Sequence, residues 1–312
     1  MTDDRPVRIG TRGSALALWQ ANHVRDELRR HHPGLVVELE IITTEGDRIQ
    51  DRPLHAIGGK GLFVKAIEER LLDGSVDLAV HSMKDLPAFG PKGLVIACTP
   101  PREDPRDALV GPAGLTLASM PAGARLGTGS LRRGALARRI NPGVEVVPIR
   151  GNVPTRMGKV DSGEVDAVLL AAAGLRRLGL ADRIAELLDP DAFCPAPAQG
   201  ILALQCREDD ARVKDVLAAL ADEGATLAAA AERGFLQRLE ASCTIPMGCH
   251  AVRHGDELEV HGLVVHPSGE PCYEGRRRGP VTEADALGRA LAHELLEAGA
   301  DAVMAELDGR PS

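Results

Sequence analysis

Apolar and polar positions follow two different periods along the first hundred residues. Short apolar runs predict strands at 7–9, 35–42, 76–82 and 94–98, whereas apolar residues at helical spacing predict helices at 15–30 and 62–72. Ser14 can cap the first helix, and Gly74 lies just beyond the second as a stop signal. Strands that alternate with helices in this way predict an α/β unit with a largely parallel sheet.

The same pattern recurs further along the chain. Arg8-Ile-Gly-Thr-Arg-Gly-Ser14 resembles Arg125-Leu-Gly-Thr-Gly-Ser130, and Gly74-Ser-Val-Asp-Leu-Ala-Val80 resembles Gly163-Glu-Val-Asp-Ala-Val-Leu169. Because both matches occur in the same order, we expect two similar α/β halves. Prolines at 100–105 and 190–197 mark the segments that leave the first half and return to it.

The return segment leads into a strand predicted at 201–206. We therefore expect an α/β domain over 1–100 plus 200–220, a second α/β domain over 105–195, and a hinge with a cleft between them. After residue 222 the pattern changes to one long helix, two or three β segments near 248–278 and terminal helices. This predicts a small α+β third domain over 223–312.

The charge of the chain is unevenly distributed. It carries 37 Lys+Arg against 45 Asp+Glu, a formal net charge of −8, yet seven arginines and a single acidic residue fall between positions 125 and 156. Arginine concentrated in an acidic protein indicates a confined anionic ligand, because its planar fork matches carboxylate or phosphate. Net acidity and an aromatic content of 2% argue against nucleic-acid binding.

Neither a long apolar stretch nor an N-terminal signal core is evident in the sequence. A cytoplasmic location without membrane contact follows as the expectation. Six scattered cysteines without a CxxC pair are then expected to be free thiols, and their spacing to histidines predicts no metal site.

Strand ends carry the candidate anion-binding groups. Gly-Thr before Ser14 and again before Ser130 places hydroxyls and free N–H groups at a helix start, although both serines would also serve as plain caps. Ligands bind at the carboxyl ends of strands in open α/β sheets. Five arginines follow such ends and could converge there, or else form a solvated basic face: Arg12, Arg132, Arg133, Arg150 and Arg156.

The segment His81-Ser-Met-Lys-Asp-Leu-Pro87 ends another strand. Continued strand alternation predicts Ser82 and Lys84 on one side and Asp85 on the other. A carboxylate in a cationic cleft can stabilise positive charge that develops on a substrate, but Asp85 can also simply order the turn before Pro87. We interpret His81 as a structural histidine.

Two further positions have open interpretations. Lys60 follows Gly58-Gly59 and belongs either to a mobile flap over the cleft or to an ordinary glycine-rich helix entry. Cys243 lies among small residues, so that its thiol is either an accessible nucleophile or anchor, or an inert small side chain.

Several long motifs resemble the porphobilinogen deaminase (hydroxymethylbilane synthase) family. They include RIGTRGSALALWQA, GGKGLFVKAIE, DLAVHSMKDLP, EDPRDALV, GTGSLRR, IRGNVPTR, PAQG and LEASCTIPMG. The resemblance implies two hinged, periplasmic-binding-protein-like α/β domains plus a small α+β C-terminal domain. It also implies a monomeric transferase that condenses four porphobilinogen molecules stepwise, with loss of ammonia, onto a covalent dipyrromethane primer. Hydrolysis then releases linear hydroxymethylbilane for tetrapyrrole and heme biosynthesis.

Residue roles follow from the same resemblance. Cys243 matches the cysteine that holds the dipyrromethane through a thioether, Asp85 the main catalytic group, and Gln199 a residue near the hinge. The matching cofactor and substrate contacts are Arg12, Ser14, Lys60, Ser82, Lys84, Thr128, Ser130, Arg132, Arg133, Arg150, Arg156 and Arg177. The alternative function is a non-catalytic, two-lobed binding protein for small polycarboxylates.

Overall fold

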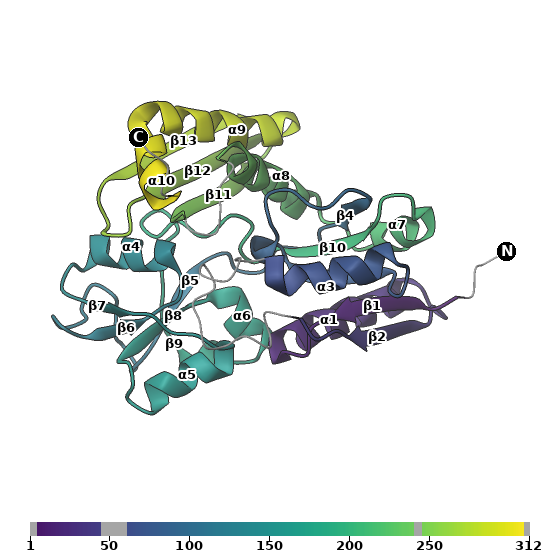
Figure 1. Ribbon diagram of the computed structural model, residues 1–312, viewed down its shortest axis with the longest axis horizontal. Coiled ribbons are helices and arrows are strands. Elements are labelled where there is room, and N and C mark those ends of the chain that lie inside the picture. Colours follow the sequence, from purple (N-terminus) through teal and green to yellow (C-terminus); the bar gives the residue numbers. More distant parts are fainter. Residues whose placement is uncertain (1–4, 45–60, 240–244, 309–312) are drawn as a thin grey trace. The chain divides into compact units, whose positions relative to one another are not determined.

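The computed structural model describes residues 5–44, 61–239 and 245–308 (Figure 1). Lys60 and Cys243 lie outside the described residues. The chain divides into two compact units, one formed by Met1–Glu103 and Ile201–Thr226 and the other by Asp104–Gly200 and Leu227–Ser312. The division into three domains stays a prediction.

The first unit is a five-stranded sheet with helices on both faces. Its elements are β1 (Val7–Thr11), α1 (Ala15–His31), β2 (Val37–Ile41), α3 (Gly61–Leu72), β3 (Leu78–Ser82), the 3-10 turn η2 (Met83–Asp85), β4 (Leu94–Cys98), β10 (Leu202–Arg207) and α7 (Ala211–Ala218). Each predicted helix and strand of this unit is therefore confirmed, with ends that differ by a few residues. Ser14 caps α1 as expected, because its side chain accepts a hydrogen bond from the backbone N–H of Ala17.

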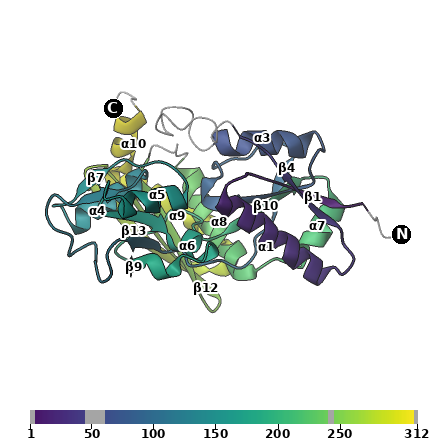
Figure 2. The ribbon, with the colours of Figure 1, turned by 90° about the horizontal axis from the view of Figure 1, so that it is seen from below.

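Apolar alternation in the strands explains why both faces of this sheet are covered. Leu78 and Val80 pack with Val24 and Leu28 of α1, whereas Ala79, which lies between them in β3, packs on the α3 side. Figure 2 shows α1 and α3 on opposite sides of the sheet.

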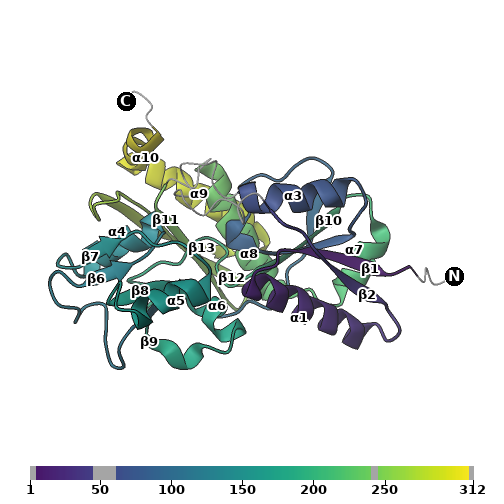
Figure 3. The same cartoon turned by 60° about the horizontal axis from the view of Figure 1, so that its bottom comes forward.

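The second unit contains another five-stranded sheet and the C-terminal elements. The sheet comprises β5 (Asp107–Val110), β6 (Arg125–Gly127), β7 (Glu145–Val147), β8 (Ala167–Ala171) and β9 (Ile184–Leu187), with α4 (Leu131–Ile140), α5 (Val153–Asp161), α6 (Ala172–Arg177) and η3 (Ala181–Arg183). Residues of α4 share a core with Leu126 and Leu169, whereas Met157 of α5 packs with Val168 and Leu170. Figure 3 shows α4 and α5 on opposite sides of these strands.

The two sheets share the same pattern of strand directions, but the fourth strand is the last of its sheet along the chain in the first unit and the first in the second unit. The strand orders are β2-β1-β3-β10-β4 and β7-β6-β8-β5-β9. In each sheet the first three strands are parallel, and the fourth runs antiparallel to both of its neighbours. The prediction of two similar, largely parallel α/β halves is confirmed.

One polar contact repeats in both units at the start of the parallel strands. The backbone N–H of Arg8 donates to Asp77 Oδ2 at 3.0 Å, and Arg8 Nη2 donates to the carbonyl of Gly74 at 2.7 Å. In the second unit the N–H of Arg125 donates to Asp166 Oδ2 at 2.7 Å, and its Nη2 donates to the carbonyl of Gly163. The repeated sequence motifs therefore make the same bonds.

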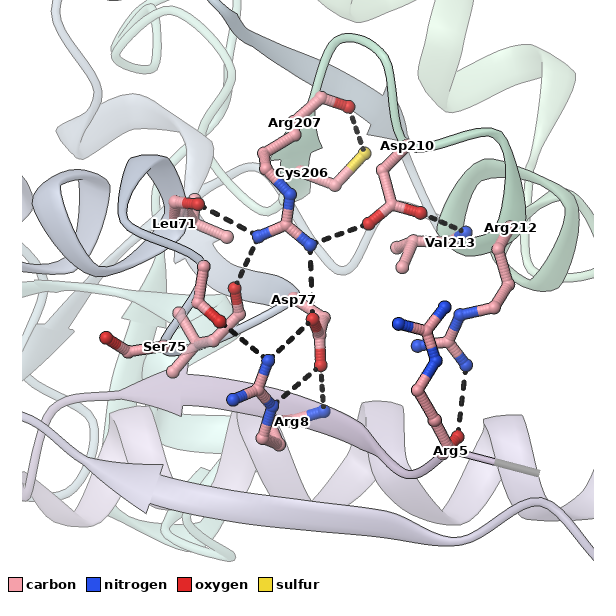
Figure 4. Close-up of polar contacts among 12 residues, drawn as sticks. Arg5, Arg8, Leu71, Ser75, Asp77, Cys206, Arg207, Asp210, Arg212 and Val213 are labelled. Carbon is pink, nitrogen blue, oxygen red and sulfur yellow. Dashed lines mark hydrogen bonds and ion pairs between the residues drawn. The ribbon is translucent and has the colours of Figure 1, made fainter. Parts of the chain in front are cut away.

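Asp77 is the more buried of the two carboxylates, with a side chain that is 7% exposed. Figure 4 shows it between Arg8 and Arg207, and Arg207 Nη2 lies 3.1 Å from Asp77 Oδ1. Burial alone would raise the pKa of Asp77, but hydrogen bonds from Arg8 and Arg207 outweigh it and hold the pKa below its usual value. The contact links the start of β1, the residue before β3 and the end of β10.

The C-terminal part of the second unit is an antiparallel sheet covered by helices. Its elements are α8 (Glu223–Arg238), β11 (Met247–His254), β12 (Glu257–Val265), β13 (Cys272–Pro280), η4 (Val281–Glu283), α9 (Ala284–Leu295), the π-helical segment η5 (Leu296–Ala300) and α10 (Asp301–Asp308). Leu263 and Val265 of β12 share a core with Leu126 and Phe193. The C-terminal sheet is therefore packed against the rest of its own unit.

Helices α8 and α9 approach each other through glycine. A Cβ atom built on Gly288 would lie 1.9 Å from the carbonyl oxygen of Ala231, a backbone atom that a side-chain movement cannot relieve. We expect Gly288→Ala to lower the free energy of unfolding by about 3 kcal/mol, measured by urea denaturation. Gly158→Ala is the matched control, because nothing lies within 4 Å of that helical glycine. The control is expected to gain up to ~1 kcal/mol, and equal stability of the two variants would contradict the close approach.

Candidate functional site

A small cavity lies at the carboxyl ends of β1 and β3 in the first unit. It measures about 90 Å³, and its polar lining residues are Arg12, Ser14, Gln20, His81, Ser82 and Asp85. Arg12 and Ser14 follow β1, Ser82 ends β3, and Gln20 of α1 donates a hydrogen bond to Ser82 Oγ at 2.8 Å. The cavity therefore combines a guanidinium, two hydroxyls and a carboxylate.

The turn that carries Asp85 differs from the predicted geometry. Strand β3 ends at Ser82, and Met83–Asp85 form a 3-10 turn. The expected alternation of Lys84 and Asp85 across a strand is wrong, because a 3-10 turn rotates successive side chains by about a third of a turn. Asp85 is exposed and lines the cavity, whereas Lys84 is not among the described residues that line it.

The predicted residues of the second unit also follow strand ends. Ser130 caps α4 after β6, and its N–H donates to Thr128 Oγ1 at 3.2 Å. Arg156 Nε donates to the carbonyl of Gly151 at 2.8 Å. Arg177, at the end of α6, donates to the carbonyl of Gly200 at 2.7 Å and is 8% exposed. Backbone carbonyls therefore hold the Arg156 and Arg177 side chains in place, whereas the Thr128 and Ser130 hydroxyls accept from backbone N–H groups.

Arg132 and Arg133 meet on a buried carboxylate that sequence reasoning did not single out. Asp107, the first residue of β5, is 0% exposed and lies 2.7 Å from Arg132 Nη1 and 2.7 Å from Arg133 Nη2. Gln199 Nε2 donates to the same carboxylate at 3.0 Å. Two guanidiniums against one carboxylate leave a net charge of about +1 in this cluster, which favours an anion nearby.

The charges of this cluster decide its protonation state. Burial would raise the pKa of Asp107, but the two arginines outweigh it and hold the pKa well below the usual value. Asp107 lies within EDPRDALV, a motif that marked the resemblance without a role for this residue. Its pairing with Arg132 could not be found from spacing alone, because the two residues are 25 positions apart on different elements.

Arg150 differs in its hydrogen bonding from the other candidate arginines of the second unit. Its Nη1 atom is buried and has no hydrogen-bond partner among the described residues. Buried polar atoms are nearly always paired, so that this guanidinium nitrogen can take an acceptor from water or from an anionic ligand. Arg150 follows β7, the strand next to β6, which places it near the end of the sheet where Thr128 and Ser130 lie.

The described part of the chain contains no group of three or more His, Cys, Asp or Glu side chains suited to a metal ion. Each helix in the described ranges is too short or too polar to cross a lipid bilayer. Burial raises the pKa of Cys98 to about 12 and the pKa values of Cys206 and Cys272 to about 11, so that these three thiols are poor nucleophiles at neutral pH.

Together these features define an α/β protein with two similar sheets, with guanidinium and hydroxyl groups after the strand ends of both sheets and a carboxylate after one of them. Family models agree with and refine this class. Residues 7–215 match the model described as porphobilinogen deaminase, dipyromethane cofactor binding domain, and residues 226–297 match the porphobilinogen deaminase C-terminal domain. The chain belongs to the porphobilinogen deaminase family.

Individual relatives cover nearly the whole chain. The porphobilinogen deaminase of Syntrophotalea carbinolica is 51% identical over 306 residues, which cover 98% of this chain and 97% of the relative. That of Roseiflexus castenholzii is 50% identical and covers 96% of this chain and 98% of the relative. Among solved structures, the methionine-binding protein MetQ has a TM-score of 0.46 at 14% identity, covering 74% of this chain and 96% of that chain. A likeness this weak indicates nothing about ligands.

Proposed function

We propose that this protein is a porphobilinogen deaminase. It condenses four porphobilinogen molecules stepwise, with loss of ammonia, onto a covalently held dipyrromethane, and water then releases linear hydroxymethylbilane. The observation that supports this most strongly is the 51% identity over 98% of the chain to a porphobilinogen deaminase. We further propose that the enzyme is a monomer that acts in the cytoplasm.

The second unit is proposed to hold the carboxylates of the oligopyrrole. Each pyrrole of this substrate class carries two carboxylates, which need cationic or N–H partners. The Nη1 atom of Arg150, which has no hydrogen-bond partner among the described residues, and the net positive Asp107 cluster support this assignment. Further proposed contacts are Thr128, Ser130, Arg132, Arg133, Arg156 and Arg177, with Gln199 as a residue of the hinge.

The dipyrromethane fits this donor set, since the described residues at these strand ends offer guanidinium and N–H groups to its acidic side chains. When bound, it supplies the primer to which successive pyrrole units are joined. The proposed attachment residue, Cys243, lies outside the described residues. A tethered primer removes the entropy of a separate encounter at every addition.

The first unit is proposed to carry the catalytic carboxylate. Asp85 shares its cavity with Arg12 and Ser14, so that a substrate carboxylate bound by Arg12 would lie close to Asp85. From there Asp85 can accept a proton or stabilise the positive charge that develops when ammonia leaves. Ser82 lines the same cavity, and Lys60 and Lys84 are the remaining proposed contacts of this unit.

Intact-mass spectrometry tests the tether. The purified protein is expected to exceed its sequence mass by two linked pyrrole units, and Cys243→Ala is expected to lack this excess and all turnover. Cys272→Ala is the matched control, because Cys272 is partly exposed yet its thiol has a raised pKa. It should retain the excess. Turnover of porphobilinogen by protein of unmodified mass would defeat the proposal.

A further inference from the structure

A hydrogen-bonded chain runs from the half-buried Glu68 through Gln205 to His81, which lines the cavity that holds Asp85. His81 Nε2 lies 3.0 Å from Gln205 Oε1, and Gln205 Nε2 donates to Glu68 Oε1 at 3.0 Å. The three residues come from β3, β10 and α3. His81 is 7% exposed and Gln205 is 3% exposed, so that this chain is largely shielded from water.

The direction of these bonds fixes the protonation of the imidazole. The Gln205 amide nitrogen donates to the Glu68 carboxylate, which turns the amide oxygen toward His81. An amide oxygen can only accept, so that His81 Nε2 must carry the proton, and Nδ1 of the neutral ring is then an acceptor. No described residue forms a hydrogen bond with Nδ1, and His81 lines the cavity.

Burial keeps the ring neutral. It lowers the pKa of His81 to about 4, although the hydrogen bond to Gln205 and the charge of Asp85 act in the opposite direction. Burial also raises the pKa of Glu68, against the hydrogen bond from Gln205. The other charged group of the cavity is Arg12, a cation that further disfavours a protonated ring.

We propose that Glu68 and Gln205 are positioning residues that hold His81 in the Nε2–H tautomer, so that Nδ1 presents a neutral acceptor beside Asp85 to an N–H donor of the substrate. This rests on the proposed function. Porphobilinogen and the growing oligopyrrole carry pyrrolic N–H groups and, before ammonia leaves, an amine. A neutral acceptor orients such a donor without the repulsion that a second cation would exert on developing positive charge.

Nitrogen-15 spectra of the histidine rings of the labelled holoenzyme test the tautomer, with His81→Gln used to assign the signal. At pH 7 we expect His81 to show protonated Nε2 and unprotonated Nδ1. Gln205→Met, of similar volume, should lose this pattern and lower kcat/KM for porphobilinogen about tenfold, the effect of one hydrogen bond. Glu69→Gln is the matched control, because Glu69 lies on the same helix but its exposed side chain faces Lys65, and this variant should keep the spectrum and the wild-type activity.

Three results would overturn the proposal: a protonated His81 at pH 7, the Nδ1–H tautomer, or a Gln205→Met enzyme with wild-type spectrum and kcat/KM. Glu68→Leu removes only the far end of the chain and replaces Gln205→Met if that variant does not fold. Because the spectra do not depend on turnover, they separate this proposal from the proposed function. If the wild-type enzyme released no ammonia from porphobilinogen, the proposed function would be wrong, whereas the assignment of the His81 tautomer would be unaffected.

Discussion

Asp107→Asn is expected to lower the free energy of unfolding by about 3–5 kcal/mol, which is the range for removing one partner of a buried ion pair. The substitution keeps the shape of the side chain, so that no cavity arises, but it leaves Arg132 and Arg133 without their counter-charge. Their side chains are only 5% and 8% exposed, and water can replace little of what the carboxylate provided. Urea denaturation at pH 7 measures the difference.

Asp166→Asn is the matched control for this prediction. It removes the carboxylate of the repeated contact with Arg125, where the two side chains are 41% and 46% exposed, and should cost less than about 1 kcal/mol. The low pKa of folded Asp107 also sets a pH dependence. The contribution of the Asp107 carboxylate to the free energy of unfolding is fully present above pH 3.8, the ordinary pKa of aspartate. It declines as the pH falls from 3.8 toward the lower pKa of the folded state. Equal losses in the two variants would exclude Asp107 as the anchor of the arginine pair.

Asp85→Asn is expected to lower kcat for porphobilinogen about 10²–10⁴-fold, the usual contribution of a positioned acid–base group. Asparagine keeps the size and hydrogen-bonding capacity of the side chain but has no negative charge and accepts no proton at neutral pH. The cavity lining that includes Arg12 and Ser14 stays intact, so that the variant should still carry the two-pyrrole mass excess. Loss of turnover with a retained primer would separate catalysis from assembly.

Asp73→Asn is the control for Asp85. Asp73 follows α3 and hydrogen-bonds Ser75 at the protein surface, away from the cavity. It should retain wild-type kcat. An Asp85→Asn enzyme with the same kcat as this control would remove Asp85 from the mechanism.

The fold was largely predictable because its signals are local. Apolar periodicity, the Ser14 cap and two repeated motifs are each contained within a few residues, and they gave the strands, the helices and the similarity of the halves. The geometry after Ser82 was not predictable in this way. Whether the chain continues as a strand or turns depends on the packing of Met83, which is 2% exposed, and not on the spacing of polar residues.

The candidate site was predictable only where a residue follows a strand end. Arg12, Ser14, Ser130 and Arg150 all have such positions. Gln20 has none, since it occupies a buried position of α1, where a polar residue gives no indication of its partner. Glu68 and Gln205 belong to elements 137 positions apart in the sequence, and only the folded sheet joins them. Their hydrogen bonds to each other and to His81 are therefore evident only in the folded structure.

The order of the strands has a consequence for synthesis on the ribosome. Strand β4 joins its sheet through β10, which follows about a hundred residues later, whereas β5 to β9 are consecutive in the chain. The nascent polypeptide can thus complete its second sheet first. Until β10 is synthesised, the edge of β3 that pairs with β10 has no strand to pair with. Exposed edges of this kind invite aggregation, so that the interval before β10 emerges is when the growing chain most needs chaperone protection.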